Sequence, residues 1–90
     1  MCRNIRPLFN MHPASSQDDV RASALQYVRK VSGYTRPSKA NEAAFNEAVE
    51  RIAAVTAELL ESLTTTAPPR SRELQIERAR ERATRRQQSA

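Results

Sequence analysis

The side chains best suited to nucleophilic or general-base chemistry near neutral pH are Cys2 and His12, both near the N-terminus. Removal of the initiator methionine would leave the α-amine of Cys2 beside its thiol, and such a pair can bind a metal ion or act as a nucleophile. Two ligands are too few for a structural zinc site within one chain, and His12 before Pro13 is typical of a surface turn. Cys2 is therefore the one candidate reactive residue.

Other chemical motifs are missing from the sequence. A single glycine excludes a Gly-rich phosphate-binding loop, and no CxxC, HExxH or EF-hand spacing occurs. The glutamates in the middle of the chain lack histidine partners at metal-binding spacing, which favours a solvated helix face. We therefore expect a protein that is not an enzyme, with no catalytic residue, no metal site and no cofactor.

Arginine dominates the polar sequence, and the net charge is +5. Six basic and two acidic side chains lie in residues 1–36, two basic and five acidic in residues 37–69, and seven basic and three acidic in residues 70–90. Two interpretations stay open: the basic ends dock on the acidic centre, or they bind a polyanion such as a nucleic acid. The planar guanidinium group suits bidentate phosphate contacts and stacking on bases.

The predicted contacts with nucleic acid or another partner lie in the N-terminal arm, near the loop after the first helix, and in the C-terminal segment. They are Arg3, Arg6, Arg29, Lys30, Tyr34, Arg36, Lys39, Arg70, Arg72, Arg78, Arg82 and Arg85. Tyr34 could stack on an unpaired base or pack back on the helices, and Arg29 and Lys30 could equally complement a helix dipole.

These residues must be positioned by helices. Ser16 and Asp19 form a predicted capping box, and Gly33 supplies a left-handed C-cap, which together indicate a first helix over about 17–32. A second helix is predicted over about 39–64, capped by Ser38 or Asn41, because its apolar residues recur at steps of three and four. These apolar residues are Phe45, Ala48, Val49, Ile52, Val55, Leu59 and Leu63.

The loop around Pro37 is short enough to join antiparallel neighbours, so the two apolar stripes should face each other. The second helix is longer, and its overhang requires cover from the arm at residues 5–9 or from a second copy of the protein. After a Pro-rich spacer at 67–70, residues 71–87 predict a polar, Arg-rich helix with too little apolar surface to pack strongly on the hairpin.

The predicted fold class is therefore all-α: an antiparallel helical hairpin braced by an N-terminal arm, plus an Arg-rich C-terminal helix. We divide the chain into a small helical domain at 1–66, the spacer at 67–70 and a basic C-terminal helix or tail at 71–90. No apolar run is long enough to span a membrane, and a lone cysteine favours the cytoplasm.

Four segments of the sequence resemble a family of small bacterial proteins catalogued as domain of unknown function 2277. They are Met1–Arg6, Val28–Tyr34, Pro37–Asn41 and Thr65–Arg70. The resemblance spans most of the chain and implies a bacterial origin, but it implies no activity, cofactor or partner.

The leading hypothesis is a non-enzymatic, basic binding protein that engages a polyanion, with RNA or a ribonucleoprotein favoured over DNA. The alternative is a protein-interaction adaptor or homodimer that uses the apolar stripe of the long helix. A third option is chemistry at Cys2. A helix-turn-helix DNA reader is disfavoured, because the turn is long and the second helix is long and acidic.

Overall fold

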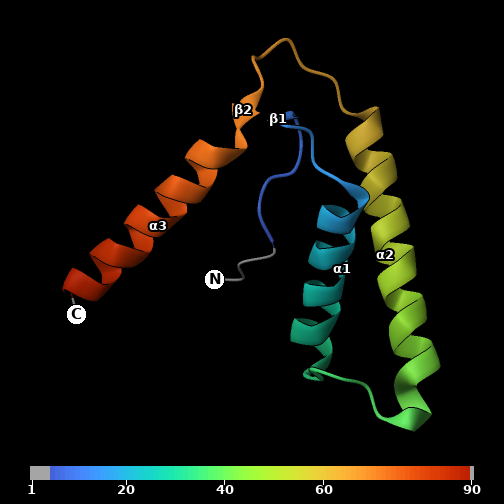
Figure 1. Cartoon of the computed structure of the whole chain (residues 1–90). Helices are drawn as coiled ribbons and strands as arrows, with labels where there is room; N and C mark the ends of the chain where they lie inside the picture. The colour runs from blue at the N-terminus through green and yellow to red at the C-terminus, as the bar shows by residue number, and fades with distance from the viewer. Residues whose placement is uncertain (1–4, 90) are drawn as a thin grey trace.

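The computed structural model describes residues 5–89 and shows a helical hairpin with a third helix standing beside it (Figure 1). In chain order the elements are β1 (Met11–His12), α1 (Gln17–Ser32), the 3-10 turn η1 (Lys39–Asn41), α2 (Glu42–Ser62), β2 (Arg70–Ser71) and α3 (Arg72–Ser89). The predicted fold class, a hairpin with an N-terminal arm and a separate C-terminal helix, is confirmed.

Helix α1 begins and ends where its sequence signals lie. The Ser16 hydroxyl accepts the Asp19 backbone N–H at 3.1 Å, and the Asp19 carboxylate accepts the Ser16 backbone N–H at 2.8 Å. At the other end Gly33 has a φ of 80° and donates its N–H to the Arg29 carbonyl at 2.9 Å. Both caps satisfy backbone groups that the helix itself leaves without partners.

Helix α2 is shorter than predicted, because the chain enters it through η1 and leaves it at Ser62. Asn41 takes the N-cap position of α2, one of the two positions predicted, but neither its side chain nor that of Ser38 makes a capping hydrogen bond. Instead the Asn41 backbone N–H donates to the Ser38 carbonyl at 3.0 Å. A tight 3-10 turn thus takes the place of a side-chain cap.

The core lies between α1 and α2 and is small. Ala24 and Val28 of α1 pack with Phe45 and Val49 of α2, and Leu25, Ala48, Ile52 and Ala53 surround them. The predicted stripe holds only in its first half: Val55, Leu59 and Leu63 are 65%, 55% and 43% exposed. Each residue turns the helix by about 100°, so Ile52, Thr56 and Leu60 continue the inner face while Val55 and Leu59 lie beside it.

The N-terminal arm crosses the hairpin and then pairs with the chain after α2. Ile5 and Leu8 of the arm line a groove of about 290 Å³ with Tyr27, Ile52 and Leu60. Strand β1 then runs parallel to β2, with Met11 opposite Arg70 and His12 opposite Ser71. This pairing is not in the sequence prediction, because two-residue strands carry no periodic signal.

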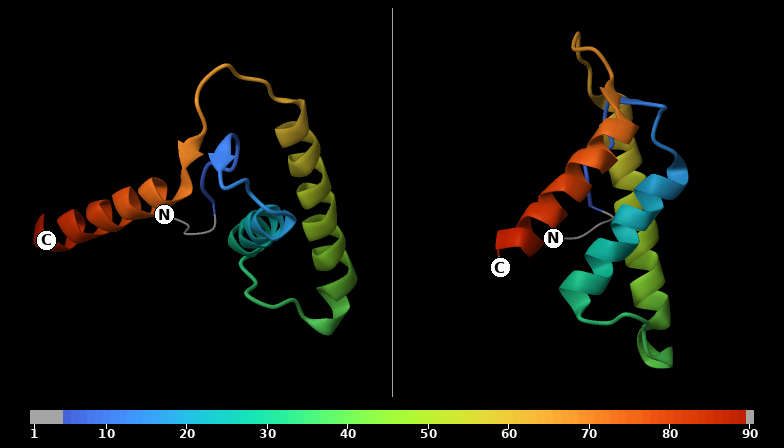
Figure 2. Two further views of the ribbon diagram at one scale, coloured as in Figure 1. Left: turned by 45° about the horizontal axis from the view of Figure 1, so that its top comes forward. Right: turned by 60° about the vertical axis from the view of Figure 1, so that its left-hand side comes forward.

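The elements form a flat V (Figures 1 and 2), with the hairpin as one limb and α3 as the other. The Cα radius of gyration is 15.6 Å, against about 12 Å for a compact domain of this length. Helix α3 contacts β2, and its sides are otherwise largely exposed among the described residues. Within that same range, no helix combines the length and apolar character that crossing a bilayer demands.

Candidate polyanion-binding surface

Helix α3 is held at its first turn by the arm. The Arg70 backbone N–H donates to the Asn10 carbonyl at 2.7 Å, and the Asn10 side-chain amide donates to the carbonyls of Ala67 and Pro68 at 3.2 and 3.1 Å. The Ser71 hydroxyl then accepts the Leu74 backbone N–H at 3.2 Å and caps the helix. The spacer is thereby fixed in direction, and α3 projects away from the hairpin.

One face of this helix carries a shallow groove of about 600 Å³. Leu74, Arg78 and Arg82 follow each other at four-residue steps and so lie in one row. The complete lining is Pro69, Arg70, Ser71, Leu74, Gln75, Arg78 and Arg82. We call Arg70, Arg78 and Arg82 the α3 arginine face.

The α3 arginine face has no carboxylate partner among the ion pairs found in residues 5–89. The glutamates of α3 lie along a neighbouring row, where Glu77 and Glu81 line a second depression with Arg80 and Arg85. Glu81 is 3.8 Å from Arg85. The arginine face therefore presents exposed positive charge beside a mixed-charge row.

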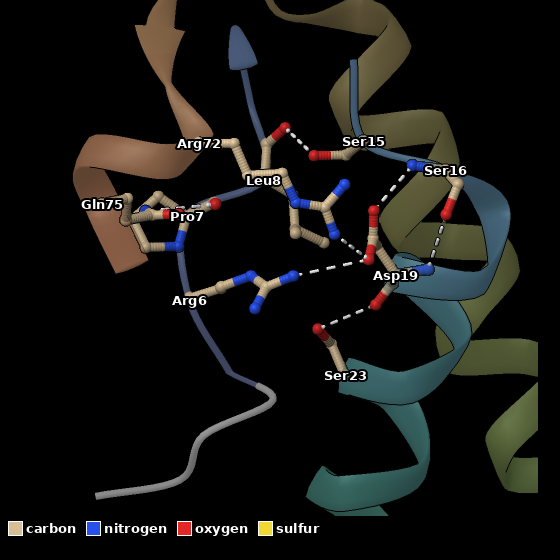
Figure 3. Close-up of polar contacts among 9 residues, drawn as sticks. All are labelled: Arg6, Pro7, Leu8, Ser15, Ser16, Asp19, Ser23, Arg72 and Gln75. Atoms are coloured by element: carbon tan, nitrogen blue, oxygen red, sulfur yellow. Dashed lines mark hydrogen bonds and ion pairs between the residues drawn. The ribbon is translucent and has the colours of Figure 1, made fainter. Parts of the chain in front are cut away.

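Asp19 joins the arm, α1 and α3 (Figure 3). Its carboxylate lies 2.7 Å from an Arg72 guanidinium nitrogen and 3.4 Å from one of Arg6, and only 14% of its side chain is exposed. The backbone N–H of Ser16 lowers the pKa of Asp19 most, and the Ser16 hydroxyl and Arg72 lower it further against the opposing effect of burial. Arg6 and Arg72, two predicted partner contacts, are thus engaged inside the protein.

Further contacts close this junction on both sides of Asp19. The Ser15 hydroxyl donates to the Leu8 carbonyl at 2.8 Å, and the Gln75 side-chain amide donates to the Pro7 carbonyl at 3.5 Å (Figure 3). Both contacts involve backbone carbonyls of the arm, which therefore lies between α1 and α3.

A second group of predicted residues lies at the tip of the hairpin, far from β2 in Figure 1. The Arg29 side chain donates to the Thr35 carbonyl at 3.1 Å and so supports the loop. Lys30, Tyr34, Arg36 and Lys39 are exposed there. Among residues 5–89 the predicted contacts therefore lie in three places: Arg6 and Arg72 at the Asp19 junction, a group at the tip of the hairpin, and the remaining arginines on β2 and α3.

Two predicted residues, Cys2 and Arg3, lie outside the described residues. His12 is exposed on β1 opposite Ser71. Among residues 5–89, no group of three His, Cys, Asp or Glu side chains is arranged to hold a metal ion.

Sequence reasoning missed two residues that position the surface. Asn10 holds the spacer through its side chain and has a φ of 57°, a conformation that asparagine tolerates better than most residues. Asp19 was predicted only as a cap, whereas it also pairs with two arginines. Arg72, which follows the spacer, was recognised as a charged residue, but no local sequence pattern indicates that Asp19 is its partner.

Comparison with known protein families identifies the family of this chain. The model of the family described as "Uncharacterized conserved protein (DUF2277)" matches residues 1–80. No curated protein and no solved structure matches the chain. The matched region includes the hairpin, both strands with Arg70, and the first half of α3 with Arg72 and Arg78, whereas Arg82 lies beyond it.

Proposed function

We propose that this chain, which belongs to the DUF2277 family, is a non-enzymatic binding protein that engages a polyanion through α3, with RNA or a ribonucleoprotein as the favoured partner. The family description carries no activity, so the proposal rests on geometry. The observation that supports it most is the α3 arginine face, whose three guanidinium groups have no carboxylate partner in the described part of the chain.

The arrangement of the groove favours a phosphate chain as its ligand. Arg78 and Arg82 lie one helical turn apart, about 6 Å along α3, and each can make bidentate contacts with phosphate oxygens. Leu74 lies in the same row and is 42% exposed, so it offers apolar contact to a base or a ribose. Arginines around an apolar side chain suit a single-stranded segment better than a uniform duplex backbone.

The tip of the hairpin offers a second contact in this proposal. Tyr34 is 44% exposed and close in sequence to Arg36, so its ring is accessible for stacking on an unpaired base. A long single strand could reach both groups of residues, whereas a short oligonucleotide would bind α3 alone. The proposal includes a cytoplasmic location, which a lone cysteine supports.

Binding to RNA is tested by fluorescence anisotropy with single-stranded RNA, duplex RNA and duplex DNA at about 50 mM salt. Arg78→Gln removes one guanidinium from the groove, whereas Arg80→Gln makes the same charge change beside the glutamate row of α3. We expect Arg78→Gln to weaken binding about tenfold, since one phosphate contact is lost. For the same reason the slope of log K against log salt concentration should become shallower by about one. Arg80→Gln should have a much smaller effect.

Two results would contradict the proposal. The first is the absence of binding to all three nucleic acids at low salt. The second is an equal loss in Arg78→Gln and Arg80→Gln, because binding would then follow net charge and not the α3 arginine face.

A further inference from the structure

One flank of α2 is apolar and open to water. Val55 and Leu59 are 65% and 55% exposed, and the helical repeat places the exposed Ala44 along the same side. Ala48 lies there too, half-buried at the border between this side and the core. Arg51 and Glu58 lie along the edge of this strip, where Arg51 pairs with Glu47 at 2.8 Å. We call the strip of Ala44, Ala48, Val55 and Leu59, with Arg51 and Glu58 at its edge, the α2 flank.

The chain exposes far more surface than a monomer of its mass normally does. Its accessible surface is 7372 Å², against about 5300 Å² for a compact monomer of 10.1 kDa. Helix α3 contributes part of the difference of about 2000 Å². A stable protein interface takes about 800 Å² from each partner, so the excess is large enough to supply one.

We propose that the α2 flank is the contact between two copies of this protein, related by a two-fold axis with their α2 helices antiparallel. Small residues at Ala44 and Ala48 allow close approach of the two helices, while Val55 and Leu59 supply the buried apolar contact. The two hairpins would together form a four-helix arrangement in which α2 and its copy are the central pair. The α3 helices take no part in this contact, so the inference is independent of the proposed polyanion binding.

The charges at the edge select the antiparallel register. When Val55 lies opposite Val55 of the second copy, residue 51 of one chain comes next to residue 58 of the other. Arg51 of each chain then faces Glu58 of its partner, and the symmetry makes this contact twice. Within one chain Arg51 pairs with Glu47, and both side chains are exposed to water. Arg51 can therefore leave Glu47 for Glu58 of the second copy at little cost in free energy.

The first test is sedimentation velocity of the full chain over a range of concentrations. We expect the wild type to dimerise and Val55→Glu to raise the dimer dissociation constant at least about tenfold, because two carboxylates meet at the axis. Ala43→Glu is the control: it introduces a glutamate at an exposed position of α2 off the α2 flank and away from Arg51 and Glu58, and should dimerise like the wild type. Circular dichroism checks that all variants keep their helix content.

Charge exchange provides the second test. Arg51→Glu places glutamate against Glu58 of the partner, and Glu58→Arg places arginine against Arg51, so each variant alone should dimerise poorly. An equimolar mixture should form a heterodimer, because both edge contacts are then opposite in charge. A monomeric wild type, equal effects of Val55→Glu and Ala43→Glu, or a mixture that dimerises no better than its components would each overturn the proposal. A monomeric wild type would mean that the flank contacts a different protein or none.

Discussion

Asp19 shows how much a single side chain can connect. It completes the capping box of α1 with Ser16, and its carboxylate also holds Arg6 of the arm and Arg72 of α3. Because only 14% of the side chain is exposed, these pairs are less screened by water than ordinary surface ion pairs. One carboxylate therefore links three segments of the chain.

The low pKa of Asp19 makes stability depend on pH in a defined direction. Its folded-state pKa lies below the ordinary value of 3.8, so the stabilisation is complete above that value and is lost as the pH falls through the folded-state pKa. We expect Asp19→Asn to lower the free energy of unfolding at pH 7 by about 1 kcal/mol and to reduce the loss of stability on acidification. Urea unfolding at a series of pH values measures both effects.

The neighbouring exposed carboxylate provides the control for this experiment. Asp18 lies in the same first turn of α1 but takes part in none of the ion pairs of the described residues. Asp18→Asn should leave the dependence on pH close to that of the wild type. Equal curves for Asp19→Asn and the wild type would contradict the structural role of Asp19.

The sequence predicted the capping role of Asp19 but not its ion pairs with Arg6 and Arg72. Ser16 and Asp19 are three residues apart, so their capping box follows from spacing alone. Arg6 and Arg72 lie 13 and 53 residues from Asp19, and no periodicity connects them. The sequence therefore shows the arginines only as a charge pattern. That Arg6 and Arg72 stabilise the fold is seen only in the structure.

Among the elements, α1 is the one whose ends are most strongly determined by its own residues. Gly33 occupies a left-handed conformation with a φ of 80°, and an added Cβ there would meet nothing within 4 Å. Any cost of substitution must therefore come from the backbone and not from a clash. The predicted bounds of α1 match the structure because both of its end signals are local.

Substitution of Gly33 tests this reasoning. Gly33→Ala should destabilise the protein by about 1 kcal/mol, since alanine is strained at positive φ. Gly33→Asn should cost clearly less, because asparagine tolerates the left-handed conformation. Thermal unfolding of the two variants gives the comparison, and an equal or smaller loss in Gly33→Ala would show that the C-cap has a different conformation.

Two features, the exposed flank of α2 and the pairing of the strands, could not be predicted from sequence patterns. The steps of three and four in α2 predicted a helix, but the same steps fit an inner face and its flank, so Val55 and Leu59 were assigned to one stripe with Phe45. The pairing of β1 with β2 depends on Asn10 and the spacer, which are separated by most of the chain. Both features are decided by tertiary contacts.

The whole molecule is an open V (Figure 2). The ion pairs of Asp19 join the hairpin to the first turn of α3. Arg6 and Arg72 pair with Asp19 inside the protein, whereas the α3 arginine face has no carboxylate partner among the ion pairs of residues 5–89. Polyanion binding by that face stays a prediction. The carboxylate that engages the two arginines belongs to α1 and not to the acidic helix α2. Asp19 thus anchors the first turn of α3 through Arg72, while the arginines of the α3 arginine face stay exposed.

An NMR titration of the full chain with a short single-stranded RNA shows directly whether the α3 arginine face binds a polyanion. We expect amide chemical shifts to change along residues 70–85, with the largest changes near Arg78 and Arg82 and smaller ones across the buried face of α1 and α2. Chemical-shift changes centred on α2, or no changes at any RNA concentration in the titration, would contradict RNA binding by the α3 arginine face.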